Sequence, residues 1–247
     1  MIFFIPFIFL LYLPSQTTQT IAQAEAQPSG NWKEESIAIS AAPNKRLLFL
    51  FTHSHEAYPG QADASGSIPV YHATKNITTF HPVIEQAFLE KGMQASLLEI
   101  DAMQLLSKHQ KSFDQAYNVI RPHLLSQIQA DSFEYVIDFH RDSAGRKVTA
   151  LKSPKGSFAK VLFIVGGEHA GYAANLELAK RLSARLEAQI PGISRGVAVK
   201  SGIGVDGVYN QDLHPKSLLI ELGGIENTQA EVEATIRQIA IAFENLE

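Results

Sequence analysis

The chain of 247 residues contains no cysteine, so it can form neither disulfides nor thiolate metal sites, and any metal must be held by His, Asp or Glu. It also lacks a cluster of Lys and Arg, and its formal net charge is -4. We therefore predict no nucleic-acid partner. There is no Gly-x-Ser-x-Gly motif, and the glycines at 166–167 and 202–207 match no dinucleotide-binding or phosphate-binding loop.

The N-terminal region differs from the rest of the chain. Ile2–Leu13 is almost wholly apolar, which is too short for an ordinary membrane-spanning helix but is typical of a signal peptide, although no Lys or Arg precedes it. Ala22-Gln23-Ala24 provides a small-x-small cleavage pattern. We predict a signal peptide or short membrane anchor at 1–24, a polar linker at 25–44 and a catalytic domain at 45–247. This organisation predicts an extracytoplasmic protein, secreted or anchored on the outer face of a bacterial cell.

Within the folded region, short apolar runs alternate with stretches of helical periodicity. We expect strands near 47–51, 95–100, 135–139, 160–165, 197–200 and 218–222. We expect helices near 80–91, 113–128, 176–190 and 232–243, with Gly92 ending the first and Pro122 disturbing the second. This alternation predicts an α/β three-layer sandwich, with a mostly parallel or mixed sheet flanked by helices.

Three of the apolar runs lead directly into residues that can bind a metal or act beside one. These residues are His53 and Glu56 after the first run, His140 after the third, and Glu221 in the last. In an open α/β sheet, ligands gather where strands end. Two His and two Glu at such positions predict a zinc hydrolase site with an open coordination position for water.

Each of these residues has a chemical reason to take part. His53 and Glu56 are three residues apart, so one loop can present both to an ion, and His140 is our candidate for the third ligand. Zinc held by three protein ligands lowers the pKa of a bound water to about 7. The alternative for each lone His is a structural, hydrogen-bonded role.

Glu221 interrupts an apolar run, where an isolated charge is costly. Near zinc it would act as general acid and base, while the alternative is a structural ion pair with a Lys or Arg. Arg141 would clamp a substrate carboxylate in a fork, and Asp142 would orient a ligand His. The alternative for these two residues is a surface ion pair. His72 follows a polar loop and is expected to approach the site, whereas the other histidines are expected at the surface or in packing.

Six motifs, taken together and in this order, resemble the stage II sporulation protein P family of bacterial cell-wall hydrolases. They cover nearly the whole folded region. The motifs are Thr52-His53-Ser54-His55-Glu56-Ala57-Tyr58, His72-Ala73-Thr74-Lys75-Asn76-Ile77-Thr78, Ile137-Asp138-Phe139-His140-Arg141-Asp142, Phe163-Ile164-Val165-Gly166-Gly167, Gly207-Val208-Tyr209-Asn210-Gln211-Asp212-Leu213 and Leu219-Ile220-Glu221-Leu222-Gly223-Gly224-Ile225-Glu226-Asn227-Thr228.

The resemblance implies a zinc amidase, with a fold similar to that of amidases and zinc exopeptidases. Its substrate would be peptidoglycan, cut at the amide between N-acetylmuramic acid and L-alanine, and some members of the family also cut peptide cross-links. By resemblance, His53, Glu56 and His140 would hold zinc and Glu221 would be the catalytic acid and base. The family also implies membrane association through the N-terminus and a lytic transglycosylase partner.

Two other functions stay open at this point. A zinc carboxypeptidase-like peptidase or small-amide hydrolase uses a similar set of residues but would release a terminal amino acid or cut a small amide. A non-catalytic peptidoglycan-binding module would bind insoluble wall without releasing soluble fragments. The presence of all four residues, His53, Glu56, His140 and Glu221, favours an enzyme.

Overall fold

The expected alternation of strands and helices is present in the computed structural model, which describes residues 45–58, 70–244 and 246. The predicted signal peptide or anchor at 1–24 and the linker at 25–44 lie outside the described residues. Within the described part of the chain, no helix is long and apolar enough to cross a membrane.

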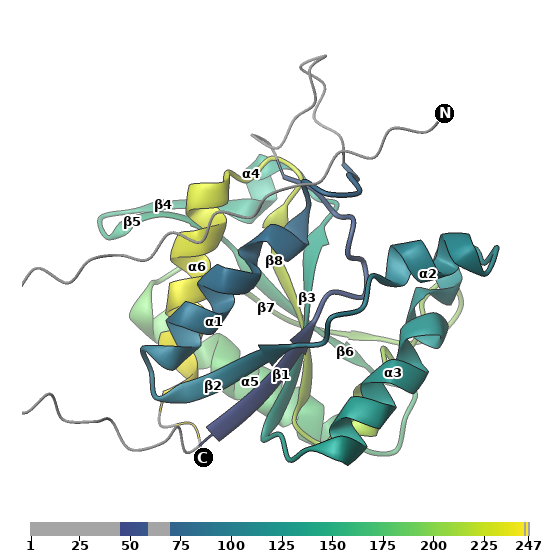
Figure 1. Ribbon diagram of the computed structural model, residues 1–247. Helices are drawn as coiled ribbons and strands as arrows, with labels where there is room; N and C mark the ends of the chain where they lie inside the picture. Colours follow the sequence, from purple (N-terminus) through teal and green to yellow (C-terminus); the bar gives the residue numbers. More distant parts are fainter. Residues whose placement is uncertain (1–44, 59–69, 245, 247) are drawn as a thin grey trace, which may run out of the picture. The chain divides into compact units, whose positions relative to one another are not determined.

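Six strands form one mixed sheet in the order β2-β1-β3-β8-β6-β7 (Figure 1). The strands are β1 (Lys45–Leu50), β2 (Met93–Leu97), β3 (Tyr135–Asp142), β6 (Val161–Gly166), β7 (Ser194–Lys200) and β8 (Ser217–Gly224). All neighbouring pairs are parallel except β6 and β8, which are antiparallel. The predicted three-layer α/β sandwich with a mostly parallel, mixed sheet is confirmed.

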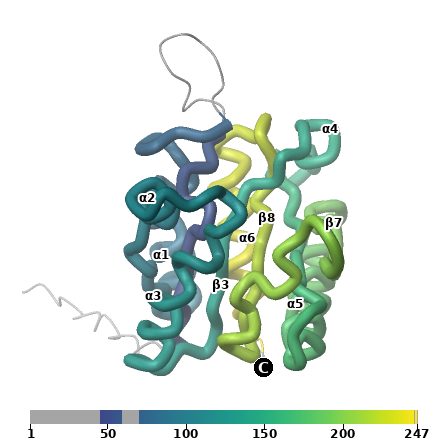
Figure 2. Tube along the Cα trace, turned by 90° about the vertical axis from the view of Figure 1, so that its right-hand side faces the viewer, coloured from purple at the N-terminus to yellow at the C-terminus, as the bar shows by residue number. Residues whose placement is uncertain are grey.

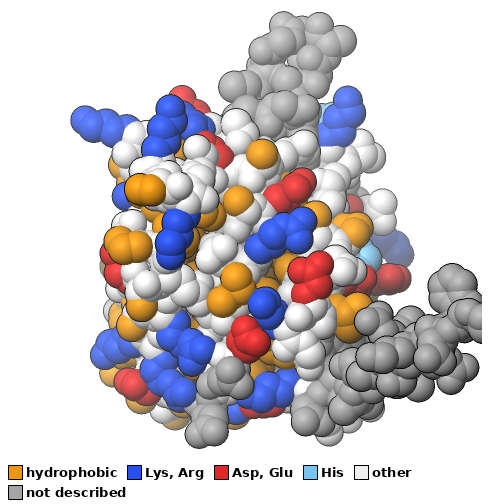
Figure 3. Space-filling view, turned by 90° about the vertical axis from the view of Figure 1, so that its left-hand side faces the viewer, with side chains coloured by type: hydrophobic (Ala, Val, Ile, Leu, Met, Phe, Trp, Pro, Cys, Tyr) orange, Lys and Arg blue, Asp and Glu red, His pale blue; other side chains and the backbone are white. Residues whose placement is uncertain are grey.

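One face of the sheet is fully covered by three helices, and we call it the closed face. The helices are α1 (His81–Leu89), α5 (Tyr172–Gln189) and α6 (Gln229–Phe243). Phe139, Phe163 and Ile220 are at most 1% exposed in the large apolar core beneath them. Helix α6 begins with a capping box in which Thr228 and Glu231 satisfy each other's backbone N–H groups. Apolar side chains are scattered among charged ones on the described surface of this side (Figure 3).

The opposite face carries only two longer helices, α2 (Ala102–Lys108) and α3 (Ala116–Ala130), and Figure 2 looks onto it. They bury a second, smaller core on β1 and β3, including Leu48, Val136 and Ile120. Over β8, β6 and the last residues of β3 this layer is incomplete. Only Tyr117 of α3 packs there on Ile164 and Leu219, and a cavity lies beside them, so we call this part the open face. Because side chains alternate along a strand, His140 and Glu221 belong to the open face while their neighbours Phe139 and Ile220 belong to the closed one.

The structure also contains elements that the sequence pattern did not predict. They are α2, the short helix α4 (Arg146–Thr149), the hairpin of β4 (Ala150–Ser153) and β5 (Gly156–Ala159), and the 3-10 helices η1 (Ile77–Phe80) and η3 (Gln211–Leu213). The helix predicted from 113 begins as the 3-10 helix η2 (Phe113–Gln115) before α3. Pro122 does not interrupt α3, in which it lies with an exposed side chain. Gly92 ends the first helical region as expected, with a φ of 70° that favours glycine.

Candidate metal and catalytic site

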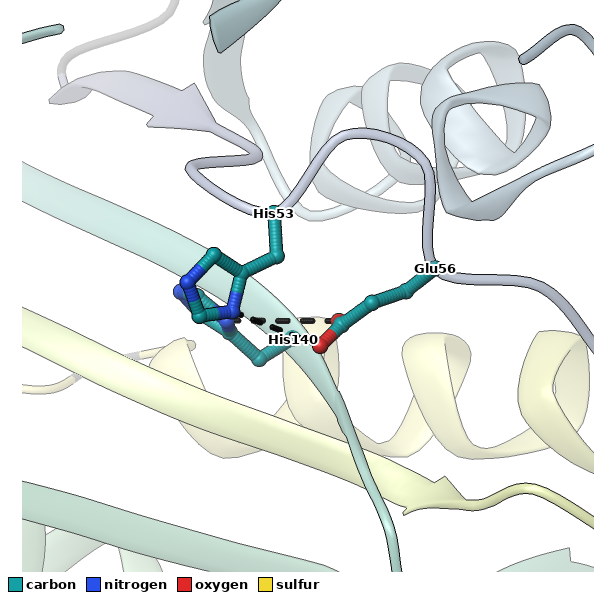
Figure 4. Close-up of side chains that lie close together, drawn as sticks. All are labelled: His53, Glu56 and His140. Atoms are coloured by element: carbon teal, nitrogen blue, oxygen red, sulfur yellow. Dashed lines mark ion pairs between the residues drawn. The ribbon is translucent and has the colours of Figure 1, made fainter. Parts of the chain in front are cut away.

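His53, Glu56 and His140 meet where β1 and β3 end (Figure 4). His53 Nδ1 lies 3.4 Å from Glu56 Oε1, and His140 Nδ1 lies 3.9 Å from Glu56 Oε2. One ligand atom from each residue lies within 4.8 Å of the others, so the three could hold a metal ion. The predicted ligands are thus brought together, in the part of the chain that the structure describes.

The turn after β1 aims two of these residues at the same point. The Glu56 N–H donates to the His53 carbonyl at 3.0 Å, which closes the turn and places both side chains on one side. The Glu56 carboxylate is fixed from β3, because the backbone N–H of Arg141 donates to Glu56 Oε2 at 2.7 Å. The turn from His53 to Glu56 therefore directs both side chains to the same position, as predicted from their spacing of three residues.

Asp138 is a residue of the site that the sequence analysis missed. Its Oδ2 lies 3.0 Å from His140 Nε2, on the side of the ring opposite to Glu56. The two atoms are within ion-pair distance, but their orientation does not meet hydrogen-bond geometry. Thr52 holds the same carboxylate with two donors, since its N–H reaches Oδ1 at 2.9 Å and its hydroxyl reaches Oδ2 at 2.6 Å. A carboxylate behind a ligand imidazole fixes the orientation of the ring. The available signal was the spacing, because residues two apart on a strand share a face.

The carboxylates determine the charge of His140. Burial disfavours its protonated form, but the negative charges of Asp138, Glu56 and Glu221 outweigh burial and raise the pKa of His140 to about 9. The surroundings of the ring therefore stabilise a positive charge, which is the field that a bound cation requires.

Glu221 lies directly beside His140, because β3 and β8 pair in a register that places the two residues opposite each other. Burial raises the pKa of its carboxyl to about 8, with Glu56 and Asp142 adding to the shift and His140 opposing it. Its Oε2 is buried and has no hydrogen-bond partner among the described residues. No ion pair of Glu221 with a Lys or Arg is present in the described part of the chain, which disfavours the structural alternative.

A cavity of about 740 Å³ opens beside these residues on the open face. Its floor is apolar and is formed by Leu162, Ile164 and Leu219. The other lining residues include His53, His140 and Glu221, the aromatic side chains Phe113, Tyr117 and Tyr209, and the charged side chains Asp114, Asp142, Lys200 and Asp206. An apolar floor with a few polar groups at one end is typical of a binding site for a small molecule or a polymer end.

Arg141 is buried and does not line this cavity. Its guanidinium donates to the carbonyls of Val70 at 2.7 Å and Asp142 at 3.2 Å. A clamp on a substrate carboxylate stays a prediction, and it would require the guanidinium to leave these carbonyls. Asp142 pairs with Arg195 at 2.6 Å and not with a ligand histidine, so the orienting role predicted for Asp142 is wrong and the carboxylate behind His140 is Asp138.

Among the described residues, none of the other histidines belongs to the candidate ligand group. His72 Nδ1 accepts the N–H of Lys75 at 2.9 Å and so stabilises a turn, while its backbone N–H donates to the His55 carbonyl at 2.8 Å. Its approach to the site stays a prediction. His55 pairs with Asp101 and His81 with Glu85, both at 2.9 Å. These contacts agree with the predicted surface and packing roles.

Fold and site together define an α/β protein with a candidate His-Glu-His metal site at the carboxyl ends of its parallel strands. Residues 14–244 match the stage II sporulation protein P family. Over 209 residues the chain is 30% identical to stage II sporulation protein P of Bacillus subtilis (strain 168), an alignment that covers 82% of this chain and 51% of the relative. The chain therefore belongs to the stage II sporulation protein P family. It spans about half the length of this curated relative.

Solved structures with a similar course of the chain include two amidases. The N-acetylmuramyl-L-alanine amidase Ami1 of Mycobacterium smegmatis is 13% identical, with 83% of this chain and 97% of that chain covered and a TM-score of 0.43. The N-acetylmuramoyl-L-alanine amidase of Clostridium difficile 630 is 12% identical, with 81% and 95% covered and a TM-score of 0.46. The fold assignment rests on the strand order and on the helices on both faces of the sheet.

Proposed function

We propose that the chain is a zinc-dependent peptidoglycan hydrolase that cuts the amide between N-acetylmuramic acid and L-alanine. The proposal rests on one observation. The candidate ligand His140 lies beside Glu221 in one cavity, and the buried Oε2 of Glu221 has no hydrogen-bond partner among the described residues. Membership of the stage II sporulation protein P family supports the same substrate.

The donor set fits zinc. Two imidazole nitrogens and one carboxylate are a common ligand set for catalytic zinc, and no thiolate is present in the chain. His53, Glu56 and His140 would hold the ion, which when bound supplies a Lewis acid for the scissile carbonyl and activates water. Asp138, held by Thr52, keeps the His140 ring in place.

Glu221 is the proposed general acid and base. It accepts a proton from the attacking water and delivers it to the leaving amine, which needs a carboxyl within reach of the reacting atoms and a pKa raised toward neutrality. Burial of Glu221 meets the second requirement, with a pKa of about 8. From the sequence, we also propose that the guanidinium of Arg141 binds a carboxylate of the stem peptide.

Further properties belong to the same proposal. An exported amidase would act outside the cell membrane, anchored or released according to the fate of residues 1–24. Cleavage of peptide cross-links and cooperation with a lytic transglycosylase are implied by the family resemblance alone. The cavity on the open face is large enough to hold a muramyl peptide end.

The first test is metal analysis of the purified chain beside its His140→Ala variant, followed by digestion of peptidoglycan with mass analysis of the products. We expect about one zinc per chain, lost in the variant, and a free amino group on L-alanine in the digest. Release of a terminal amino acid would indicate a carboxypeptidase-like enzyme instead. Binding to the wall without soluble products would indicate a binding module, and absence of zinc after zinc has been supplied would refute the zinc mechanism.

A further inference from the structure

The segment Gly207–Leu213 forms one of the sequence motifs, yet the proposed reaction gives it no part. Two consecutive residues in it, Tyr209 and Asn210, have left-handed backbone conformations with φ of 56° and 55°. This region is uncommon for residues other than glycine, and a bulky tyrosine there is an outlier. Such strained residues persist only where their surroundings hold them, and they concentrate at functional sites.

The neighbours of Tyr209 hold the strained backbone in place. Asn210 donates to the Tyr117 carbonyl at 2.9 Å and accepts from Arg121 at 3.0 Å. Gln211 is 1% exposed and bonds β6 twice, accepting from the Gly166 N–H and donating to the Ile164 carbonyl, both at 2.9 Å. The polar side chains that follow Tyr209 thus tie the segment to α3 and to the sheet.

Asp206 fixes the backbone on the N-terminal side of Tyr209. Asp206 Oδ1 accepts the N–H of Val208 at 3.1 Å and also accepts the N–H of Tyr209. The side chains that precede and follow Tyr209 therefore fix its backbone. Among the described residues no side chain bonds its hydroxyl, whose oxygen accepts a hydrogen bond from the backbone of Gly207.

Tyr209 points into the cavity that contains His140 and Glu221. Its half-buried ring contacts Tyr117 edge-on, with the ring centroids 5.2 Å apart and an interplanar angle of 82°. Partial burial and the charge of Asp206 raise the pKa of the Tyr209 hydroxyl, with smaller contributions from Glu168 and Glu221, although a hydrogen bond from the Gly207 backbone opposes them. The hydroxyl therefore keeps its proton at neutral pH and is available as a hydrogen-bond donor.

We propose that Tyr209 is a substrate-binding residue whose hydroxyl donates a hydrogen bond to a carbonyl oxygen of the peptide amide held in the cavity. The inference rests on the proposed function in so far as the substrate is an amide. It adds a contact that neither the metal ligands nor Glu221 supplies. The ring of Tyr209 makes the contact with Tyr117, and its oxygen accepts from the Gly207 backbone, which leaves the hydroxyl proton for a bond to the substrate.

The test is Tyr209→Phe, which keeps the ring and removes the donor. We expect kcat/KM on a soluble muropeptide to fall at least about 10-fold, which corresponds to about 1.4 kcal/mol. Zinc content and melting temperature should equal those of the wild type. Tyr172→Phe is the matched control, since Tyr172 is an exposed tyrosine at the start of α5 that does not line the cavity, and it should behave as wild type.

A second arm measures binding without turnover. In a Glu221→Gln background, adding Tyr209→Phe should weaken the binding of the same muropeptide about 10-fold or more. Unchanged kcat/KM and unchanged binding would overturn the inference, and so would a loss accompanied by loss of zinc or a lower melting temperature. If the wild type binds the muropeptide but does not cut it, the proposed function fails and the binding arm decides about Tyr209. If the wild type does not bind it, both fail.

Discussion

The two faces of the central sheet differ in what their residues do. On the closed face, Phe139, Phe163 and Ile220 are buried under three helices among other apolar side chains. On the open face, the same strands carry His140 and Glu221 into a cavity, where Glu221 Oε2 is buried without a partner. Residues adjacent in sequence therefore belong to two environments, one that stabilises the fold and one that is available for chemistry.

The difference follows from the incomplete helix layer on the open face. Helices α2 and α3 bury the part over β1 and most of β3. The cavity lies beside α3, over the last residues of β3 and over β8 and β6. Polar groups with shifted pKa values collect at this boundary, as they do at functional sites generally. The candidate site thus lies where α2 and α3 leave the sheet uncovered, while the larger apolar core lies under α1, α5 and α6.

The largest expected effect is on the closed face. Ile220→Ala removes a side chain that is 0% exposed and leaves a cavity in the main core, so the free energy of unfolding should fall by about 2–5 kcal/mol. The folded fraction should still bind zinc with wild-type affinity, because Ile220 does not line the site. Denaturant unfolding measures the first quantity and metal titration the second. A loss below about 1 kcal/mol would contradict the assigned role of this face.

The next effect concerns the adjacent residue on the other face. Glu221→Gln should lower kcat by roughly 100-fold or more, as loss of a general acid and base does, while zinc stays bound. The free energy of unfolding should not decrease, because the variant removes a buried ionisable group that has no partner. Steady-state kinetics and metal analysis check both statements. Full activity in this variant would remove Glu221 from the mechanism.

Glu221→Gln should also change how the free energy of unfolding depends on pH. In the metal-free protein the native state keeps a proton on Glu221 up to about pH 8, whereas the ordinary pKa of 4.5 applies to the unfolded chain. The unfolded state therefore binds fewer protons between these values, and stability falls as pH rises through this window. Glu221→Gln should show a smaller fall. An identical pH dependence of unfolding in the two metal-free proteins would contradict the burial of this carboxyl.

A smaller effect, on zinc affinity, is expected from Asp138, which lies beside the candidate ligand His140. Asp138→Asn places an NH2 group against either the His140 ring or the Thr52 N–H, so one pair of donors faces each other. Zinc affinity should fall about 10–100-fold, measured by competition with a chelating dye. Asp131→Asn, at a partly exposed ion pair with Arg46, is the control and should bind zinc as the wild type does. Equal affinities for the two variants would show that Asp138 does not position His140.

The smallest effect should come from Thr52→Val. Thr52 is fully buried, and valine removes the hydroxyl that bonds Asp138 Oδ2 at 2.6 Å while the backbone N–H bond to the same carboxylate is retained. We expect a loss of about 1 kcal/mol in stability and a decrease in zinc affinity smaller than for Asp138→Asn. Thr52→Ser keeps the hydroxyl and should restore zinc affinity. Failure of serine to restore it would indicate that shape, not the hydrogen bond, matters at this position.

Most of the fold could be predicted from the sequence, because each buried strand is a short apolar run and the longer helices show clear periodicity. Helix α2 was missed since seven residues with two buried positions give almost no pattern. Pro122 was overestimated as a helix breaker, because its position on the exposed side of α3 leaves the helix intact. Strands β3 and β8 continue to Asp142 and Gly224, so His140 and Glu221 lie inside the carboxyl ends of the strands and not just beyond them.

The sequence predicted those residues of the site whose side-chain type indicates metal binding. It did not predict residues whose role depends on the position of their neighbours in the fold. His53, Glu56 and His140 were expected together, and the structure brings them together. Asp138 was missed because a carboxylate inside an apolar strand has no distinct meaning until its partners are known. The orientation of Tyr209 depends on a left-handed backbone, which the sequence of a tyrosine does not indicate.

The position of β8 has a consequence for how the molecule is assembled. This strand lies between β3 and β6, both of which precede it in the chain, so the sheet closes only when a late segment enters the middle of it. The three candidate ligands are synthesised well before β8, whereas the carboxyl of Glu221 arrives with it. A growing chain would thus contain all three candidate ligands for an ion before it contains Glu221, the proposed residue for proton transfer. The complete candidate site would form only when β8 inserts into the sheet.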